Sequence, residues 1–144
     1  MNFRIIISII FYIFILSSCS NKKIDNSNFF QGVVIEGKRE ARQLDIPMAN
    51  ISIIPYSIGE GVYSCNVVVK SKRFNAMCYY STERPTVLEA HIFGFYKDLY
   101  NQKISIYLKN FIRKPVKNIS FEQVKLLIKQ DIKSCYEDFN NIRY

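Results

Sequence analysis

The sequence predicts an all-β domain, a small six-stranded β-barrel with a C-terminal α-helix, preceded by a signal peptide. Two observations lead to this expectation. About six short segments read as strands, several of them with alternating apolar and polar residues as in half-buried strands, and turn-forming residues separate them. One long segment near the C-terminal end instead carries apolar residues at helical spacing. Short strands followed by one helix indicate a barrel that the helix covers.

Composition limits the number of domains and the kinds of partner that the chain can have. The 144 residues have room for one domain, and 49% hydrophobic residues are enough for a real core. The net charge of +8 favours anionic partners, although scattered surface lysines explain it equally well. Aromatic residues follow core spacing and do not alternate with a basic stripe, so we expect no nucleic-acid partner. We also expect a monomer.

Residues 1–19 have the features of a lipoprotein-type signal peptide. Arg4 supplies the positive charge, and the unbroken apolar run Ile5–Leu16 is too short to span a bilayer core of ~30 Å as a helix. The run ends in Leu-Ser-Ser-Cys at Cys19, which resembles a bacterial lipobox. A plain signal anchor is the alternative.

From the lipobox we expect Cys19 to carry a lipid and the domain to be exported and anchored to a bacterial membrane. Residues 20–28 are polar and show no pattern, so they are expected to form a flexible tether. The folded domain should then occupy residues 29–144.

The predicted strands are Phe29–Glu36, Ile51–Ile54, Gly61–Lys70, Arg73–Tyr80, Thr86–Phe95 and Lys103–Phe111. A turn at Ser71-Lys72 would place Cys65 directly opposite Cys78. That position permits a disulfide in an oxidising compartment if the backbone geometry allows it. Two core thiols are the default expectation, and the disulfide remains the alternative.

The predicted helix covers Ser120–Phe139. Ser120 is a suitable N-cap, and Gln123 stands at the capping-box position. Apolar residues at helical spacing form the expected buried stripe, namely Phe121, Val124, Ile128, Ile132, Cys135 and Phe139.

The stretch Gly32–Asn50 is the first candidate for a binding site. It contains an apolar strand, a charged loop and a turn at Pro47 that ends on Asn50. The loop carries the cations Lys38, Arg39 and Arg42, a composition suited to holding phosphate. Loops at strand ends are common places for ligand chemistry.

Four blocks of this chain, in order and at similar spacing, resemble the riboflavin kinase domain family, which also forms the C-terminal half of bacterial bifunctional FAD synthetases. The blocks are Gly32–Asn50 with Ile46-Pro47-Met48-Ala49-Asn50 at its end, then Gly61-Val62-Tyr63, then Arg84-Pro85-Thr86 with Glu89-Ala90-His91 and Asp98-Leu99-Tyr100, and finally Ile112-Arg113 with the helix. Together they cover about Gly32–Phe139.

The resemblance implies a six-stranded Greek-key barrel. It also implies a kinase that uses ATP and Mg²⁺ to phosphorylate the 5′-hydroxyl of riboflavin, giving FMN. The roles carried over by the family motifs are a catalytic base at Glu89, ATP and phosphate contacts at Gly37, Lys38, Arg39, Arg42 and Asn50, a Mg²⁺ ligand at Asn50 and a flavin contact at Arg113. These residue types suit phosphoryl transfer, which depends on positioning, charge neutralisation and hard oxygen ligands for the metal.

The chain departs from the family pattern in the same stretch. Met48 stands in the slot of the family threonine, and a thioether is a soft, poor ligand for Mg²⁺. Glu40, Ala41 and Asp45 stand where the family has glycines. The alternative function is therefore a catalytically degenerate, lipid-anchored barrel that binds a flavin or another ligand. His91 is expected to be a structural neighbour of the site and not a metal ligand.

Overall fold

The computed structural model describes residues 28–37, 46–54 and 58–141 of the 144-residue chain. The described residues form six strands and one long helix. They are β1 Phe29–Ile35, β2 Ala49–Ser52, β3 Gly61–Val69, β4 Lys72–Tyr80, β5 Val87–Ile92, β6 Lys103–Arg113 and α2 Phe121–Asn140.

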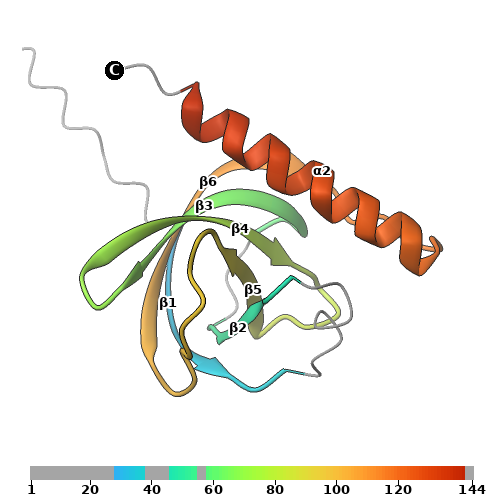
Figure 1. Cartoon of the computed structure of the whole chain (residues 1–144). Coiled ribbons are helices and arrows are strands. Elements are labelled where there is room, and N and C mark those ends of the chain that lie inside the picture. The colour runs from blue at the N-terminus through green and yellow to red at the C-terminus, as the bar shows by residue number, and fades with distance from the viewer. Residues whose placement is uncertain (1–27, 38–45, 55–57, 142–144) are drawn as a thin grey trace, which may run out of the picture.

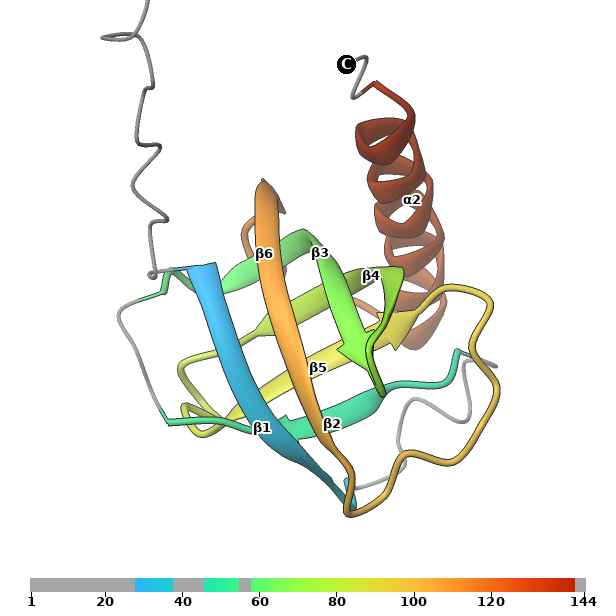
Figure 2. The same cartoon turned by 90° about the vertical axis from the view of Figure 1, so that its left-hand side faces the viewer.

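The strands close into a barrel in the order β1-β2-β5-β4-β3-β6, and every neighbouring pair is antiparallel (Figures 1 and 2). Strands β3, β4 and β5 are neighbours in chain order and form a meander. Strand β2, which precedes them in the chain, pairs with β5. This is a Greek-key arrangement. The predicted six-stranded barrel with a C-terminal helix is therefore confirmed.

The barrel interior holds the main core, because successive strand residues point alternately inward and outward. In β5, Leu88, Ala90 and Ile92 are buried, whereas Glu89 and His91 are only partly covered. The largest fully buried side chains of the interior include Phe30, Val34, Ile51, Val67, Leu88, Ile104 and Ile106. Polar side chains of β5 are thus directed away from this core.

Helix α2 begins as predicted. The Ser120 hydroxyl accepts a hydrogen bond from the Gln123 backbone N–H (3.3 Å), and the Gln123 side-chain oxygen accepts one from the Ser120 N–H (2.8 Å). Phe121, predicted to be buried, is 46% exposed, because the buried positions of α2 lie further along the helix, at Asp131 and Cys135. In the described part of the chain, no helix combines the length and hydropathy needed to cross a bilayer.

The helix packs outside the barrel wall formed by β3, β4 and β6 (Figure 1). A second apolar cluster fills this contact and includes Val62, Met77, Ile112, Ile128, Ile132, Cys135 and Phe139. Polar contacts fix the helix in place. Arg113 forms two charge-assisted hydrogen bonds with the buried Asp131 (2.7 and 2.6 Å), and Asp138 accepts from Ser64 and Asn110 (2.5 Å each).

The turn between β3 and β4 lies one residue earlier than predicted. Lys70 and Ser71 form it, both with positive φ (46° and 67°), and the strands then pair Cys65 with Ala76. The expectation that Cys65 faces Cys78 directly is therefore wrong, because moving the turn by one residue moves every cross-strand partner by two.

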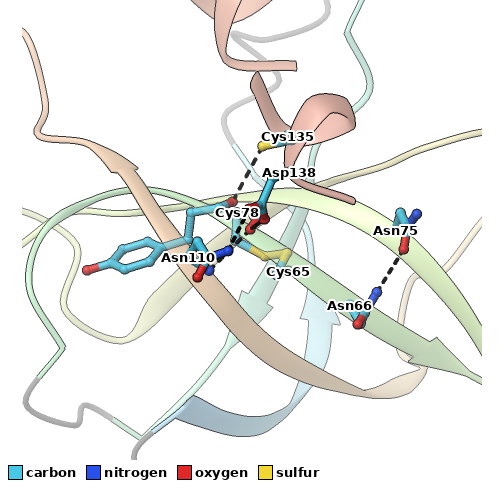
Figure 3. The surroundings of a disulfide bond; sticks show 9 residues. Cys65, Asn66, Asn75, Cys78, Asn110, Cys135 and Asp138 are labelled. Atoms are coloured by element: carbon cyan, nitrogen blue, oxygen red, sulfur yellow. Dashed lines mark hydrogen bonds between the residues drawn. A yellow bond between two sulfur atoms is a disulfide. The ribbon is translucent and has the colours of Figure 1, made fainter. Parts of the chain in front are cut away.

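Cys65 and Cys78 nevertheless form a disulfide inside the barrel (Figure 3). They occupy diagonal positions on β3 and β4 with a Cα–Cα distance of 6.2 Å, within the range that a disulfide spans. Both side chains are fully buried. The default expectation of two core thiols is wrong, because both side chains point into the interior and diagonal inward neighbours lie close enough to bond.

The third described cysteine is a free thiol. Cys135 lies in the cluster between α2 and the barrel, where its Sγ–H donates to the Tyr63 carbonyl oxygen (4.0 Å; Figure 3). Burial, together with the nearby carboxylates of Asp131 and Asp138, raises the pKa of Cys135 to about 12. The thiol therefore stays protonated and unreactive at neutral pH.

The disulfide should contribute measurably to stability. Non-reducing mass spectrometry of the full chain should find Cys65 joined to Cys78. Reduction should lower the free energy of unfolding by about 2–4 kcal/mol, because the covalent link restricts the unfolded chain. Urea denaturation with and without reductant measures this change.

An alkylating reagent provides the control. In denaturant without reductant it should label Cys135 and leave Cys65 and Cys78 unmodified. In the native protein Cys135 should also resist labelling at pH 8, because its thiol is buried and protonated. Labelling of Cys65 or Cys78 before reduction contradicts the disulfide.

Candidate functional site

A cavity of about 480 Å³ opens where the ends of β1, β2 and β5 meet the loop that follows β5. Its walls combine polar, charged and aromatic side chains with a few core residues. The lining residues are Val34, Gly37, Pro47, Met48, Ala49, Asn50, Arg84, Glu89, Ala90, Ile92, Phe95, Tyr96, Lys97, Asp98, Leu99 and Tyr100. This volume and mixed lining are typical of a small-molecule site.

The pairing of β2 with β5 places two predicted site residues side by side. Asn50 and Glu89 are direct partners in the antiparallel register, so their side chains leave the sheet on the same face. His91 contacts the segment just before β2, which leads into the site, since its ring nitrogen Nδ1 lies 2.9 Å from the Pro47 carbonyl oxygen.

Arg84 connects these two residues. Its Nη1 donates to Glu89 Oε1 (2.6 Å), and its Nη2 donates to Asn50 Oδ1 (3.3 Å). The guanidinium therefore offsets the charge of the Glu89 carboxylate and holds its orientation. Arg84 is part of the Arg84-Pro85-Thr86 motif, but no role was predicted for it from the sequence. The signal that could have found it is its place in the β4–β5 turn, just before Glu89.

Gly37 gives the Asn50 side chain its space. A Cβ atom at position 37 would overlap the side-chain amide of Asn50. Gly37 and Asn50 come from opposite ends of the charged stretch, and the structure brings them together at the wall of the cavity. The absence of a side chain at position 37 is therefore a condition for the observed orientation of Asn50.

Met48 lines the cavity and also packs against the apolar cluster under α2. Asn50 thus offers a hard oxygen to a metal, while Met48 offers only a soft sulfur. Among the described residues, no group of three or more His, Cys, Asp or Glu could hold a metal ion by itself. Mg²⁺ fits this donor set when phosphate and water oxygens supply most of its ligands, as is usual for nucleotide-bound Mg²⁺.

An aromatic wall after β5 completes the cavity. Phe95, Tyr96 and Tyr100 line it, and Tyr96 is 88% exposed. The Asp98 carboxylate accepts a hydrogen bond from the Tyr100 backbone N–H (2.8 Å) and so shapes this loop. Exposed aromatic rings beside a pocket are well suited to contact a planar ligand. Sequence reasoning noted the Asp-Leu-Tyr motif but did not assign this wall.

Of the predicted site residues that the structure describes, Arg113 is not part of this arrangement. Arg113 lies outside the cavity lining, where its guanidinium pairs with Asp131 of α2 and donates to the Lys114 carbonyl oxygen (2.9 Å). Lys38, Arg39 and Arg42, as well as Cys19, lie outside the described residues.

The fold and the site define the class of this protein as a closed antiparallel β-barrel with a cavity of small-molecule size. Comparison with protein families then gives a more specific result. Residues 25–139 match the family described as Flavokinase: Riboflavin kinase, and the chain belongs to this family. The matched range agrees closely with the four motif blocks.

Curated relatives support the same assignment. The chain is 32% identical over 128 residues to the "Trifunctional protein RibF/MnmA" of Mycoplasmoides gallisepticum, covering 84% of this chain and 20% of that protein. It is 34% identical over 122 residues to the "Bifunctional riboflavin kinase/FMN adenylyltransferase" of Buchnera aphidicola, covering 77% and 38%. The chain thus spans about a fifth to two fifths of the length of these relatives.

Solved structures share the fold. A riboflavin kinase from Trypanosoma brucei superposes with a TM-score of 0.57 at 18% identity, covering 79% of this chain and 80% of that one. A structure described as a macrolide-efflux protein from Streptococcus pneumoniae superposes with a TM-score of 0.67 at 24% identity, covering 75% and 38%. At these identities, the likeness establishes the fold alone.

The substitution Gly37→Ala should displace Asn50 with little effect on stability. The new methyl group occupies the place of the Asn50 amide, which is the far end of a flexible side chain and can rotate away. The free energy of unfolding should change by no more than ~1 kcal/mol. The side-chain amide signals of Asn50 in a ¹⁵N NMR spectrum should shift.

Gly59→Ala is the matched control, because a Cβ there meets only the Tyr63 hydroxyl at 3.4 Å. It should leave the Asn50 signals unchanged. Unchanged Asn50 signals in Gly37→Ala as well would show that the packing of Gly37 against Asn50 is not as described.

Proposed function

We propose that this domain phosphorylates the 5′-hydroxyl of riboflavin with ATP, giving FMN and ADP. The observation that supports this most is the convergence of Glu89 and Asn50 on one cavity in a domain of the riboflavin kinase family. The cavity volume and its exposed aromatic wall also suit a flavin-sized, planar ligand.

In the proposed reaction, Glu89 accepts the proton of the terminal ribityl hydroxyl. The hydroxyl oxygen attacks the γ-phosphorus of ATP, and the bond between that phosphorus and the β–γ bridging oxygen breaks to release ADP. Glu89 lies at the cavity wall with its side chain 25% exposed, so a substrate hydroxyl can reach it. The contribution of such a base is typically about 10²–10⁴-fold in rate.

Asn50 is the residue that would hold Mg²⁺, through its amide oxygen, together with the phosphates of ATP. When bound, Mg²⁺ neutralises phosphate charge during the transfer. Lys38, Arg39 and Arg42, which follow Gly37 in the chain, supply further positive charge for the triphosphate in this proposal.

A second candidate is a lipid-anchored barrel that binds a flavin without phosphorylating it. Met48 favours this candidate, because the slot of the family threonine holds an apolar side chain that also packs under α2. A kinase at this site has to work without a hydroxyl ligand at position 48. Binding of riboflavin does not need that hydroxyl.

Flavin fluorescence and chromatography distinguish the two candidates. The full chain in detergent with riboflavin and Mg-ATP should form FMN, and Glu89→Gln should reduce the rate by about 10²-fold or more while retaining riboflavin binding. Quenching of riboflavin fluorescence without FMN formation supports the binding protein. The absence of both quenching and conversion would contradict both candidates.

We further propose that the domain is exported and held at a membrane by a lipid on Cys19. The lipobox-like sequence before Cys19 motivates this proposal. The buried Cys65–Cys78 disulfide supports it independently, because disulfides persist in oxidising compartments and are rare in the cytosol.

Metabolic labelling with a clickable fatty acid tests the anchor. The wild-type chain expressed in bacteria should incorporate the label and sediment with membranes. Cys19→Ala should lose the label and leave the membrane fraction. Equal membrane association of both forms, without label in either, contradicts lipidation at Cys19.

A further inference from the structure

Arg84 is the one cation among the described residues that lines the cavity and bonds to two of the predicted site residues. It comes from the short segment between β4 and β5. Its N–H donates to the Ser81 carbonyl oxygen (3.1 Å), and its own carbonyl oxygen accepts from the Val87 N–H (3.0 Å). Both sides of the Arg84 backbone are therefore fixed by the turn.

The target of the guanidinium is a pair of residues on two different strands. Asn50 on β2 and Glu89 on β5 are direct register partners, and the planar fork of Arg84 bonds to one oxygen of each. A guanidinium suits this task because its N–H donors point in fixed directions within one plane. A lysine ammonium has the charge but not the geometry.

The ion pair of Arg84 with Glu89 is less exposed than the nearby pair of Lys117 with Glu83. The nearby pair of Lys117 with Glu83 is largely exposed, with side-chain exposures of 65% and 72%, and such pairs contribute little. The Arg84–Glu89 pair is less exposed, at 38% and 25%, and lies at the cavity wall. Its strength therefore bears directly on the site.

We infer that Arg84 is a positioning residue, which sets the orientation of the Glu89 carboxylate relative to the Asn50 amide for phosphoryl transfer to a flavin hydroxyl. This inference rests on the proposed kinase function. Arg84 holds the carboxylate beside the Asn50 amide at the cavity wall, so that the base and the oxygen ligand act on one substrate position. The energetic effect of such alignment is large, since a misplacement of about 1 Å can cost ~100-fold in rate.

Other charged or titratable groups face Glu89 as well. Tyr79 on β4 is its cross-strand partner, His91 follows on the same strand face, and Lys97 and Asp98 line the cavity from the loop after β5. The Arg84 variants alter none of these residues.

The test compares Arg84→Met and Arg84→Lys with the matched control Arg73→Met, in the full chain in detergent. Arg73 lies over the Tyr107 ring (5.1 Å) and does not line the cavity. The side-chain ¹³C carboxyl signal of Glu89, assigned by its loss in Glu89→Gln, and the side-chain amide signals of Asn50 are recorded at one fixed neutral pH. In Arg84→Met both sets of signals should shift, because the guanidinium no longer contacts either side chain, while Arg73→Met should match the wild type.

Kinetics add a second readout. Arg84→Met should lower kcat for FMN formation by about 10- to 100-fold and leave the KM for riboflavin nearly unchanged. Arg84→Lys keeps the charge but not the planar fork, so it should still shift the Asn50 amide signals and lower kcat. A shift of the Asn50 signals is not expected from a loss of stability alone.

Each outcome decides the inference. Glu89 and Asn50 signals in Arg84→Met equal to those of the wild type overturn it, as does Arg84→Lys with wild-type Asn50 signals and wild-type kcat. If Arg84→Met does not fold, Arg84→Lys carries the test. If the wild type forms no FMN, the kinase proposal fails, while the Glu89 and Asn50 signals still decide whether Arg84 positions these side chains.

Discussion

The pairing of β2 with β5 is the contact on which the site depends. β2 has only four residues, and it is held between β1 and β5. Its register puts Asn50 beside Glu89 and, on the opposite face, buries Ile51 with Leu88 in the core. A slip of one residue would exchange the two faces and bury the polar pair. The apolar interior therefore fixes the geometry of the polar site.

Around this pairing, the remaining elements have separable tasks. The disulfide and the interior side chains stabilise β3 and β4, while α2 covers the outside of the same wall through Asp131, Asp138 and an apolar cluster. The cavity lies on other elements, at β1, β2, β5 and the aromatic loop. Arg113, bound to Asp131, belongs to the attachment of the helix in this structure.

Much of the fold was predictable from local sequence patterns. Alternation located the six strands, and Ser120 with Gln123 located the start of α2, because both signals arise within a few residues. The disulfide was harder to predict, since a turn at Lys70-Ser71 instead of Ser71-Lys72 changes every partner in the hairpin. The role of Arg84 depends on β2 pairing with β5, a long-range contact that no local pattern encodes.

In the proposed kinase, the Asn50–Glu89 pair faces the reacting end of the flavin substrate. A crystal structure of the full chain with riboflavin and Mg-ADP is the decisive test of this geometry. The flavin should lie in the cavity, with the terminal ribityl hydroxyl within about 3 Å of a Glu89 carboxylate oxygen. A flavin bound elsewhere, or one bound in the cavity with its ribityl chain directed away from Glu89, would contradict it.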